Sequence, residues 1–363
     1  MITLDNIHLL DDDEIHSFLS QSLNQLLKHQ DLDATTMRAV MLAIMHGRCP
    51  DALMGAILIA LRLKGESINE ISVAADVMRQ LADKVVLDDL TGVVDIVGTG
   101  GDGASLFNVS TAAAFVVASS GAIVAKHGNR GVSTKSGSSD LLQSAGVRLD
   151  LDNQQIHACL HEQQLGFLFA PNHHKAMKHA IGVRAQLKAR TIFNVLGPLT
   201  NPAGVVNSVI GVFDKSLCHP LAQVLKNLGS RHVIVVHSTD GLDEFSLAGD
   251  NFVSELKDGV ITDYIVRPDD VNLATQSLEG LTVSSPEDSL SLIKQALQGT
   301  SDDARIKKAQ DIIAFNAGAA IYVAGKADSL RHGVELAKQL INHGQGYQKL
   351  QKFAAFTQSL KST

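Results

Sequence analysis

Two segments rich in glycine and hydroxyl side chains each follow a short β-branched run. The first, residues 98–103, has the sequence GTGGDG and comes directly after residues 93–97, VVDIV. The second follows residues 122–125 and opens with Lys126, His127, Gly128, Asn129 and Arg130. Glycine lets main-chain N–H groups approach an anion closely, and Lys126 and Arg130 add positive charge. These residue types predict a phosphate-binding site.

The elements around the two segments would place them side by side. Residues 93–97 and 122–125 are typical of buried parallel strands, and Asn108 to Thr111 open an apolar helix that runs to residue 119. Loops at the carboxyl ends of neighbouring parallel strands form the ligand crevice of an open α/β sheet. A helix N-terminus adds a favourable dipole for an anion. The pattern therefore predicts a large anionic ligand at one sheet edge.

The first loop also satisfies the spacing of a dinucleotide-binding motif. Gly98, Gly100 and Gly103 match GxGxxG, which is weak evidence on spacing alone. The acidic residue expected near the end of the second strand is missing, and Lys126 stands there instead. Asp102 would repel a pyrophosphate unless a cation lies between them, and the Walker pattern is absent. The sequence disfavours a nicotinamide cofactor.

Adjacent carboxylates follow a third predicted strand. Asp243 and Glu244 come after residues 232–237 and a loop that contains Gly241, on the same expected sheet edge. Carboxylates together with substrate phosphates are a common way to hold Mg²⁺. Adjacent carboxylates are also often no more than a solvated acidic pair. Both interpretations stay open on the pattern alone.

Residues 173–190 are expected to form a basic helix, in which two arginines are the candidates for binding. Arg184 and Arg190 precede Ile192 and Phe193, which should be buried. A buried arginine needs an anionic partner, so one of the two could hold a carboxylate substrate, although a surface position is the ordinary alternative. The histidines of this segment lack metal-ligand spacing and are interpreted as packing or surface residues, with His174 nearest to a site; they are His173, His174 and His179.

Composition describes a globular protein with an ample core. The chain has 363 residues, 45% of them hydrophobic and 19% charged, and a net charge of −7. No run of 18 apolar residues occurs, and the acidic N-terminus is unlike a targeting peptide, so we expect a cytoplasmic protein with no membrane partner. The three cysteines lie far apart and suggest neither disulfides nor zinc. An acidic chain suits a small anionic ligand better than nucleic acid.

Residues 1 to about 90 are typical of helices. We expect Asp33 to cap a helix that runs to Met45, Asp51 to cap one over residues 52–63, and Ser67 with Glu70 to form a capping box. The helix over residues 52–63 is apolar nearly all round, which is typical of a buried helix or one at a subunit interface. After Gly92 the pattern changes to strand–loop–helix units, followed by a hairpin about Asp258-Gly259 and C-terminal helices at residues 304–323 and 329–342.

Taken together, these motifs resemble the anthranilate phosphoribosyltransferases, over nearly the whole chain. The specific stretches are GTGGDG at Gly98, NVST at Asn108, KHGNRGVSTKSGSSD at Lys126, FLFAPNHHKAMKHAIGVRAQLKARTIFNVLGPLTNPA from Phe167, and GLDE at Gly241. The resemblance implies transfer of a phosphoribosyl group from phosphoribosyl pyrophosphate (PRPP) to the amine of anthranilate, the second step from chorismate to tryptophan. We expect pyrophosphate to leave and no covalent intermediate or general base to be needed.

The resemblance also implies the fold and the assembly. It predicts an α/β protein with a small α-helical domain and a larger α/β domain whose mostly parallel sheet is flanked by helices, as in the nucleoside phosphorylases. The helical domain would take residues 1–90 plus about 173–200, and the α/β domain residues 91–172 plus 201–363. A homodimer would form through the helical domain.

The site residues that the resemblance implies fall into three sets. Mg²⁺, two ions per monomer, would be held by Ser110, Asp243 and Glu244, and anthranilate would lie at Gly98, Asn129 and Arg184, with Lys126 and Arg184 as electrostatic groups. PRPP would contact Gly98, Gly101, Asp102, Asn108, Val109, Ser110, Thr111, Lys126, His127, Gly128, Asn129, Arg130, Gly131, Val132, Ser133, Thr134 and Ser138.

Four positions depart from the pattern of the family. Leu106 stands where a threonine often touches PRPP, so that contact is not carried over, and Gly131 replaces an alanine or serine. Lys175 and Gly182 replace prolines, which should make the segment near Arg184 more mobile.

Two other functions stay open. A nucleoside phosphorylase would share the fold, but the Arg184 segment and GTGGDG argue against it. A nucleic-acid-binding paralogue without catalysis should have a basic groove and eroded loops, whereas this chain is acidic and keeps both loops.

Overall fold

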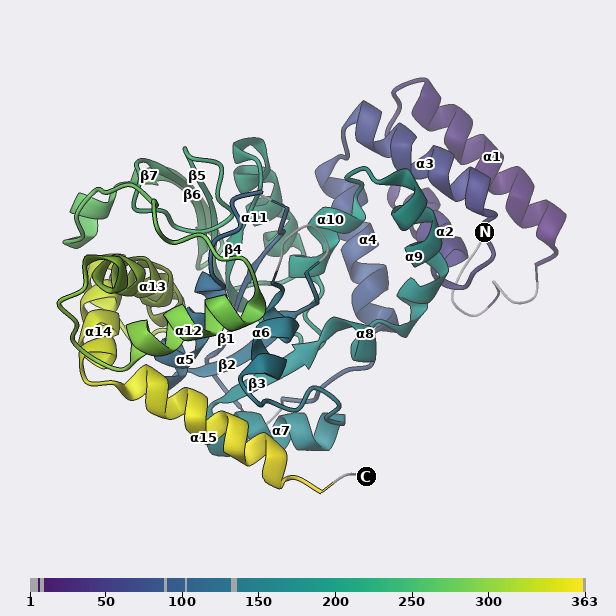
Figure 1. Cartoon of the computed structure of the whole chain (residues 1–363). Coiled ribbons are helices and arrows are strands. Elements are labelled where there is room, and N and C mark those ends of the chain that lie inside the picture. The colour runs from purple at the N-terminus through teal and green to yellow at the C-terminus, as the bar shows by residue number, and fades with distance from the viewer. Residues whose placement is uncertain (1–5, 7–9, 88–89, 102, 132–135, 362–363) are drawn as a thin grey trace. The chain divides into compact units, whose positions relative to one another are not determined.

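The computed structural model describes residues 6, 10–87, 90–101, 103–131 and 136–361. The chain forms two compact units, each built from two stretches of sequence. The first unit comprises Met1–Asp83 and Pro171–Thr200, and the second comprises Lys84–Ala170 and Asn201–Thr363 (Figure 1). The sequence placed these boundaries near residues 90, 173 and 200. A helical unit and an α/β unit are present, so the expected fold class is confirmed.

The first unit is helical, and polar side chains define several of its helix starts. Asp33 accepts the N–H of Thr36, and Ser67 and Glu70 form the expected capping box. The expected cap at Asp51 is wrong, because the helix begins at Asp51 itself after Pro50 and has no side-chain cap bond. The helices of this unit are α1 Asp12–Leu27, α2 Ala34–Met45, α3 Asp51–Lys64, α4 Ile68–Leu81, α8 Ala170–His173, α9 Lys178–Leu187 and α10 Phe193–Leu196, with 3₁₀ turns at Lys175–Met177 and Gly197–Leu199.

The expected continuous helix over residues 173–190 is wrong. The helix α8 ends at His173, and His174 has φ −109° and ψ 56°, which is not a helical conformation. His173 is buried and is held by Asp83, whose carbonyl oxygen lies 2.8 Å from Nδ1 and whose N–H donates to the carbonyl of His173. This anchoring interrupts the helix, and α9 restarts it at Lys178.

The second unit is built on a seven-stranded sheet with the order β3-β2-β1-β4-β5-β6-β7. The first five strands of this order are parallel, and β6 and β7 add an antiparallel hairpin at one edge. The carboxyl ends of β1, β2 and β5 therefore lie at one sheet edge, as the motif positions required. The strands are β1 Val93–Gly98, β2 Ile123–Gly128, β3 Leu165–Phe169, β4 Asn207–Gly211, β5 His232–Ser238, β6 Asn251–Lys257 and β7 Val260–Val266.

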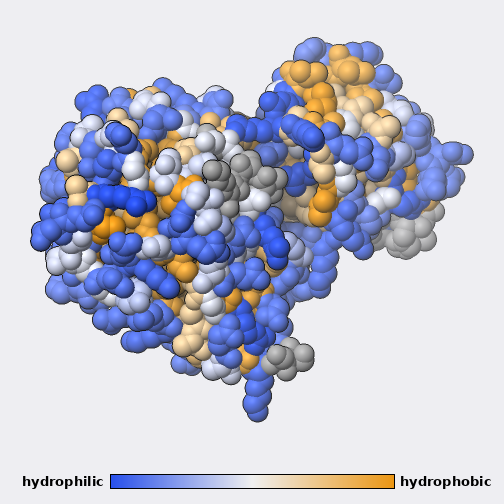
Figure 2. Space-filling view, viewed as in Figure 1, coloured by the Kyte–Doolittle hydropathy of each residue, from blue (hydrophilic) through white to orange (hydrophobic). Residues whose placement is uncertain are grey.

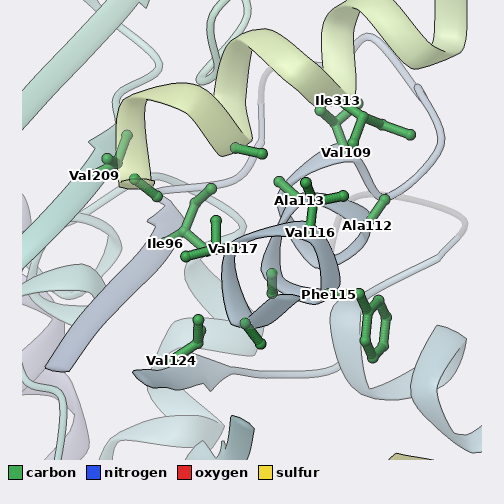
Figure 3. Close-up of a cluster of buried hydrophobic side chains, with 14 of the residues drawn as sticks. Ile96, Val109, Ala112, Ala113, Phe115, Val116, Val117, Val124, Val209 and Ile313 are labelled. Atoms are coloured by element: carbon green, nitrogen blue, oxygen red, sulfur yellow. The ribbon is translucent and has the colours of Figure 1, made fainter. Parts of the chain in front are cut away.

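Helices cover the sheet, and two of them form much of the core. Helix α5 is buried nearly all round, and it packs against α13 and against β1 and β2. Figure 3 shows Ile96 of β1, Val117 of α5 and Ile313 of α13 in this cluster. The helices of the unit are α5 Val109–Ser119, α6 Ser138–Ser144, α7 Asn153–Gln163, α11 Cys218–Asn227, α12 Pro286–Leu297, α13 Ala304–Val323, α14 Leu330–Asn342 and α15 Gln345–Ser359, with 3₁₀ turns at Lys215–Leu217 and Pro268–Val271. Among the described residues, no helix has the length and apolar character needed to span a membrane.

The second strand is longer than the sequence indicated. Strand β2 runs to Gly128, so Lys126 and His127 belong to the strand and not to the loop after it. The register places Lys126 opposite Phe167 and His127 opposite Leu168 of β3. Both side chains are buried, and this changes how Lys126 can act.

Candidate active site

The first glycine-rich loop leaves the end of β1 and is fastened to β4. The N–H of Thr99 donates to the carbonyl of Gly211 at 2.9 Å, and its hydroxyl accepts the N–H of Phe213 at 3.1 Å. Gly100 and Gly101 have φ values of 69° and 79°, in the left-handed region that favours glycine. Asp102, an expected PRPP contact, lies outside the described residues. The loop is thus shaped by glycine and held at its base.

The carboxylate of Asp243 lies against this loop. One oxygen accepts the N–H of Gly100 at 2.5 Å, and the side chain is 8% exposed. A Cβ atom on Gly98 would overlap this carboxylate, and one on Gly211 would overlap the carbonyl oxygen of Asp243. Both strand ends therefore need glycine so that the segment after β5 can approach them.

Glu244 connects the same segment to helix α5. Its Oε1 accepts the N–H of Ser110 at 3.0 Å, in the first turn of that helix. The structure thus brings together the three residues expected to bind metal, Ser110, Asp243 and Glu244. Their oxygens are the hard ligands that Mg²⁺ prefers, so the donor set fits that ion. Among the described residues no cluster of three or more His, Cys, Asp or Glu side chains could hold a metal.

Lys126 lies in the interior of the α/β unit. Its side chain is 3% exposed, and its Nζ donates to the carbonyl of Ile96 and lies 3.4 Å from the hydroxyl of Ser110. Burial lowers the pKa of Lys126, and the nearby carboxylates of Asp95 and Glu244 oppose that shift. The ammonium is therefore bound to protein groups beneath the site, close to one expected metal ligand.

Asp95 and Asn201 support this lysine, and the sequence analysis missed both. Burial raises the pKa of Asp95 to about 6, against the opposing effect of Lys126 and of its hydrogen bonds. Asn201 Nδ2 donates to the Asp95 carboxylate and to the carbonyl of Ala125, both at 2.8 Å. The N–H of His127 donates to the other carboxylate oxygen at 3.1 Å. The available signal was a single acid inside the apolar run VVDIV.

The second loop is closed at its base by Asp140, which was also missed. Its Oδ2 accepts the N–H of Gly131 at 3.0 Å and that of Gly137 at 2.9 Å. The carbonyl of Asn129 accepts the hydroxyl of Ser138 at 3.2 Å. Three expected PRPP contacts, Val132, Ser133 and Thr134, lie outside the described residues. The ends of this loop are thus fixed by one carboxylate.

Asn108 joins the second loop to the start of α5. Its Oδ1 accepts the hydroxyls of Ser136 and Ser289, both at 2.8 Å, and its Nδ2 donates to the carbonyl of Ser136 at 3.0 Å. Both ends of the amide are engaged within the protein. Asn108 therefore acts first as a support, whatever it contributes to PRPP binding.

The remaining expected PRPP contacts differ in accessibility. Arg130, Gly131 and Asn129 are exposed, and the guanidinium carbon of Arg130 lies 6.0 Å from the ring centroid of Phe169. Ser110, Gly98, Gly101, Gly128 and Ser138 are partly exposed, whereas Val109, Thr111 and His127 have buried side chains. The side chains of the three buried residues are therefore closed off from solvent.

Arg184 belongs to the helical unit and lies on α9. Its guanidinium carbon is 5.4 Å from the ring centroid of Phe193, and the side chain is half-buried. Burial lowers the pKa of Arg184. Within the part of the chain that the structure describes, Arg184 forms no salt bridge with a carboxylate. A half-buried guanidinium of this kind suits an external carboxylate.

The four departures have local explanations. Lys175 forms an exposed ion pair with Asp83 at 3.1 Å, and a side chain added at Gly182 would meet open space. Leu106 forms an isolated bridge to Thr282 and packs against the core of the α/β unit. Gly131 is exposed and bonded to Asp140. Whether Lys175 and Gly182 increase mobility stays a prediction.

Comparison with known proteins agrees with this geometry. A model of the glycosyl transferase family a/b domain matches residues 90–347, and a model of the helical bundle domain of that family matches residues 20–82. Two curated anthranilate phosphoribosyltransferases are similar to it, one from Psychrobacter sp. with 55% identity over 96% of each chain, and one from Acinetobacter baylyi with 54% identity over 94% of this chain and 98% of the relative.

The chain belongs to the anthranilate phosphoribosyltransferase family.

Solved structures of anthranilate phosphoribosyltransferases share the fold. The enzyme from Thermus thermophilus has 39% identity and a TM-score of 0.86, over 93% of this chain and 99% of that one. The enzyme from Saccharomyces cerevisiae, solved in complex with PRPP and Mg, has 26% identity and a TM-score of 0.85, over 95% and 99% of the two chains. The resemblance indicated by the sequence motifs is confirmed.

Proposed function

We propose that this protein transfers the phosphoribosyl group of PRPP to the amine of anthranilate. The observation that carries the proposal is the convergence of Asp243 and Glu244 on the GTGGDG loop and on the first turn of α5. Membership of the anthranilate phosphoribosyltransferase family supplies the substrate class. In the reaction a bond forms between the amine nitrogen and ribose C1, the bond from C1 to pyrophosphate breaks, and the amine loses a proton.

The proposed metal ligands are Ser110, Asp243 and Glu244. The yeast relative was solved with PRPP and Mg, and the oxygen donor set of this chain fits the same ion. When bound, Mg²⁺ would supply positive charge to the pyrophosphate as it departs. Two ions per monomer are part of the proposal. The carboxylates have a second task in this chain, because their bonds to Gly100 and Ser110 hold the two backbone segments in place.

The chain itself would hold PRPP between its two glycine-rich loops. The GTGGDG loop and the positive end of the α5 dipole would face the phosphates, and exposed Arg130 would add charge from the second loop. Buried Lys126 would contribute through space and through its contact with Ser110. Loops fixed at their bases by Thr99 and Asp140 keep these groups oriented, which limits the reorganisation needed during the reaction.

The acceptor needs orientation more than activation. An aryl amine is neutral at pH 7 and already nucleophilic, so no general base is required. Its carboxylate needs a partner, and Arg184 can supply a bidentate one. Catalysis would rest on positioning and electrostatics. We further propose a cytoplasmic homodimer that forms through the helical unit, Met1–Asp83 and Pro171–Thr200.

The direct test is a fluorescence assay with the full chain, PRPP, Mg²⁺ and anthranilate. Loss of anthranilate fluorescence that requires both PRPP and Mg²⁺ is the expected result. The double variant Asp243→Asn, Glu244→Gln keeps the shapes of both side chains but removes two charges, so it should need far more Mg²⁺. A wild-type protein that never consumes anthranilate contradicts the activity. A double variant with wild-type Mg²⁺ dependence contradicts the metal site alone.

A further inference from the structure

A buried side-chain amide on α13 is hydrogen-bonded to the segment that carries Asp243 and Glu244. Asn316 is 2% exposed, and its Oδ1 accepts the N–H of Phe245 at 3.0 Å. Its Nδ2 donates to the carbonyl of the same Phe245 at 2.9 Å and to that of Ile312, one turn earlier in α13, at 3.0 Å. One amide therefore fixes both polar groups of the residue that directly follows Glu244.

The side chain of Phe245 is fixed to the same helix. Its ring stacks on Phe315 with the centroids 4.6 Å apart, and both rings are fully buried. Helix α13 also packs against α5, which carries Ser110, and Figure 3 shows Ile313 of α13 beside Val109 of α5. The same helix thus supports both sources of the proposed metal ligands.

Hydrogen bonds between short side chains stabilise the rest of the segment. Asp240 accepts the hydroxyl of Ser238 and, at 2.6 Å, that of Ser246. Asn251 accepts the N–H of Ser246 at 2.7 Å. Both flanks of the two carboxylates are thus fixed, and the carboxylates accept the N–H groups of Gly100 and Ser110.

We propose that Asn316 is a positioning residue for the metal-binding carboxylates. In this role it acts on the Phe245 backbone, which it fixes so that Asp243 and Glu244 keep their geometry. The inference rests on the proposed function, in which those carboxylates hold Mg²⁺. Asparagine is a poor helix former, yet Asn316 lies in the interior of α13. Both of its hydrogen bonds to the loop go to one residue, Phe245.

Two substitutions at Asn316 test whether its hydrogen bonds, and not only the space that its side chain fills, are needed. Asn316→Asp keeps the shape but loses the donor, which places an acceptor against the carbonyl of Phe245. Asn316→Leu removes both bonds to Phe245, as well as the bond to Ile312, and leaves the buried N–H and C=O of Phe245 without this partner. A matched control is Gln310→Leu on the same helix, because Gln310 is also buried and donates to the carbonyls of Ala296 at 3.0 Å and Gly299 at 2.6 Å.

The experiment uses the full-length protein and two readouts. Hydrogen exchange of the peptide over residues 238–250, measured without ligands, reports loop order directly. The Mg²⁺ concentration for half-maximal activity and the KM for anthranilate report function. For both Asn316 variants we expect the hydrogen-exchange rate over residues 238–250 and the Mg²⁺ concentration for half-maximal activity to rise about tenfold, because a buried hydrogen bond is lost. The KM for anthranilate should stay nearly unchanged. Gln310→Leu should lower the melting temperature but shift neither readout.

The two possible failures are distinguishable. A wild-type protein indifferent to Mg²⁺ contradicts the proposed metal site. A Mg²⁺-dependent wild type whose Asn316 variants keep the wild-type exchange rate and half-saturation contradicts the positioning role. Equal shifts in Gln310→Leu would also contradict it, because general destabilisation would then explain the effect. If Asn316→Leu does not fold, the isosteric Asn316→Asp still gives both readouts.

Discussion

Arg184 is a half-buried cation whose guanidinium carbon lies 5.4 Å from the centroid of the Phe193 ring, and we propose that it binds the carboxylate of anthranilate. In Arg184→Ala the anthranilate carboxylate would lose a bidentate partner, so the KM for anthranilate should rise roughly 10- to 100-fold, in line with the value of charged hydrogen bonds. The KM for PRPP should change less than about threefold. Lys178→Ala, an exposed cation on the same helix, is the control. Equal losses for both substrates would contradict the assignment.

His174 provides a pH-dependent prediction at the same scale. The side chain is 9% exposed, and burial together with nearby His173 lowers the pKa of His174 from 6.5 to about 4. A histidine with a lowered pKa in the folded state contributes stability that is fully present above pH 6.5, the pKa of the unfolded state. This stability is lost as the pH falls toward 4, because the unfolded state then binds the proton more readily. Between pH 7.5 and 5 the loss should be about 2 kcal/mol.

Urea unfolding at these two pH values checks this prediction. His174→Gln cannot be protonated, so the difference in unfolding free energy between wild type and variant isolates this group from other titrating residues. The variant should lose about 2 kcal/mol less stability than the wild type over the same pH range. An identical pH response in the two proteins would show that the folded His174 is not held neutral.

At the scale of elements, strand ends and loops meet closely enough to exclude a single methyl group. Gly211, at the end of β4, faces the carbonyl of Asp243, and an added Cβ would overlap that oxygen. The obstacle is backbone, which cannot rotate away as a side chain can. The segment after β5 would therefore have to move, and the proposed metal ligands would move with it.

Gly211→Ala should raise the Mg²⁺ concentration for half-maximal activity by about tenfold or more. A loss of about 1–2 kcal/mol in the binding free energy of Mg²⁺, caused by displaced ligands, is sufficient for this. Gly182→Ala on α9 is the comparison, because its Cβ would meet open space. Alanine in a helix interior should add about 0.5–1 kcal/mol of stability there and leave the Mg²⁺ response unchanged. A fully active Gly211→Ala protein would show that the segment tolerates displacement.

At the scale of the whole molecule, the helical unit exposes apolar side chains that a subunit interface would cover. Leu27 on α1 is 62% exposed and Leu63 on α3 is 74% exposed. Figure 2 shows hydrophobic surface over this part of the helical unit. The sequence indicated that α3 is too apolar for a solvent-facing helix, and the exposure of Leu63 is compatible with that view.

Light scattering after size exclusion tests the proposed homodimer. The wild type should have twice the monomer mass of 38.7 kDa, and Leu63→Asp should shift the population toward the monomer because it places a charge in an apolar interface. Val260→Asp changes a comparably exposed valine, 63% accessible, on strand β7 of the other unit and should stay dimeric. A monomeric wild type, or a dimeric Leu63→Asp, would contradict this interface.

Much of this architecture was readable from short stretches of sequence. The helix starts at Asp33, Ser67 and Asp303 depend on neighbouring side chains that cap the backbone. The hairpin at Asp258-Gly259 depends on two turn residues with positive φ. The glycines of GTGGDG are likewise local, because only the conformation of their own backbone requires them. Errors arose where tertiary contacts decide, as at His173, where the bond to Asp83 interrupts a helix of suitable composition.

The sequence by itself determined the family and the change from helices to alternating strands and helices after Gly92, and it proposed candidate residues for binding phosphate and metal, which stay predictions. Only the tertiary structure decided which polar groups meet, because those contacts join residues far apart: Gly100 with Asp243, 143 positions away, and Phe245 with Asn316, 71 positions away. It also decided that Lys126 is buried beside Asp95 instead of lining a loop. A local pattern specifies periodicity and backbone conformation, whereas the burial of a charge depends on which strands the sheet places around it.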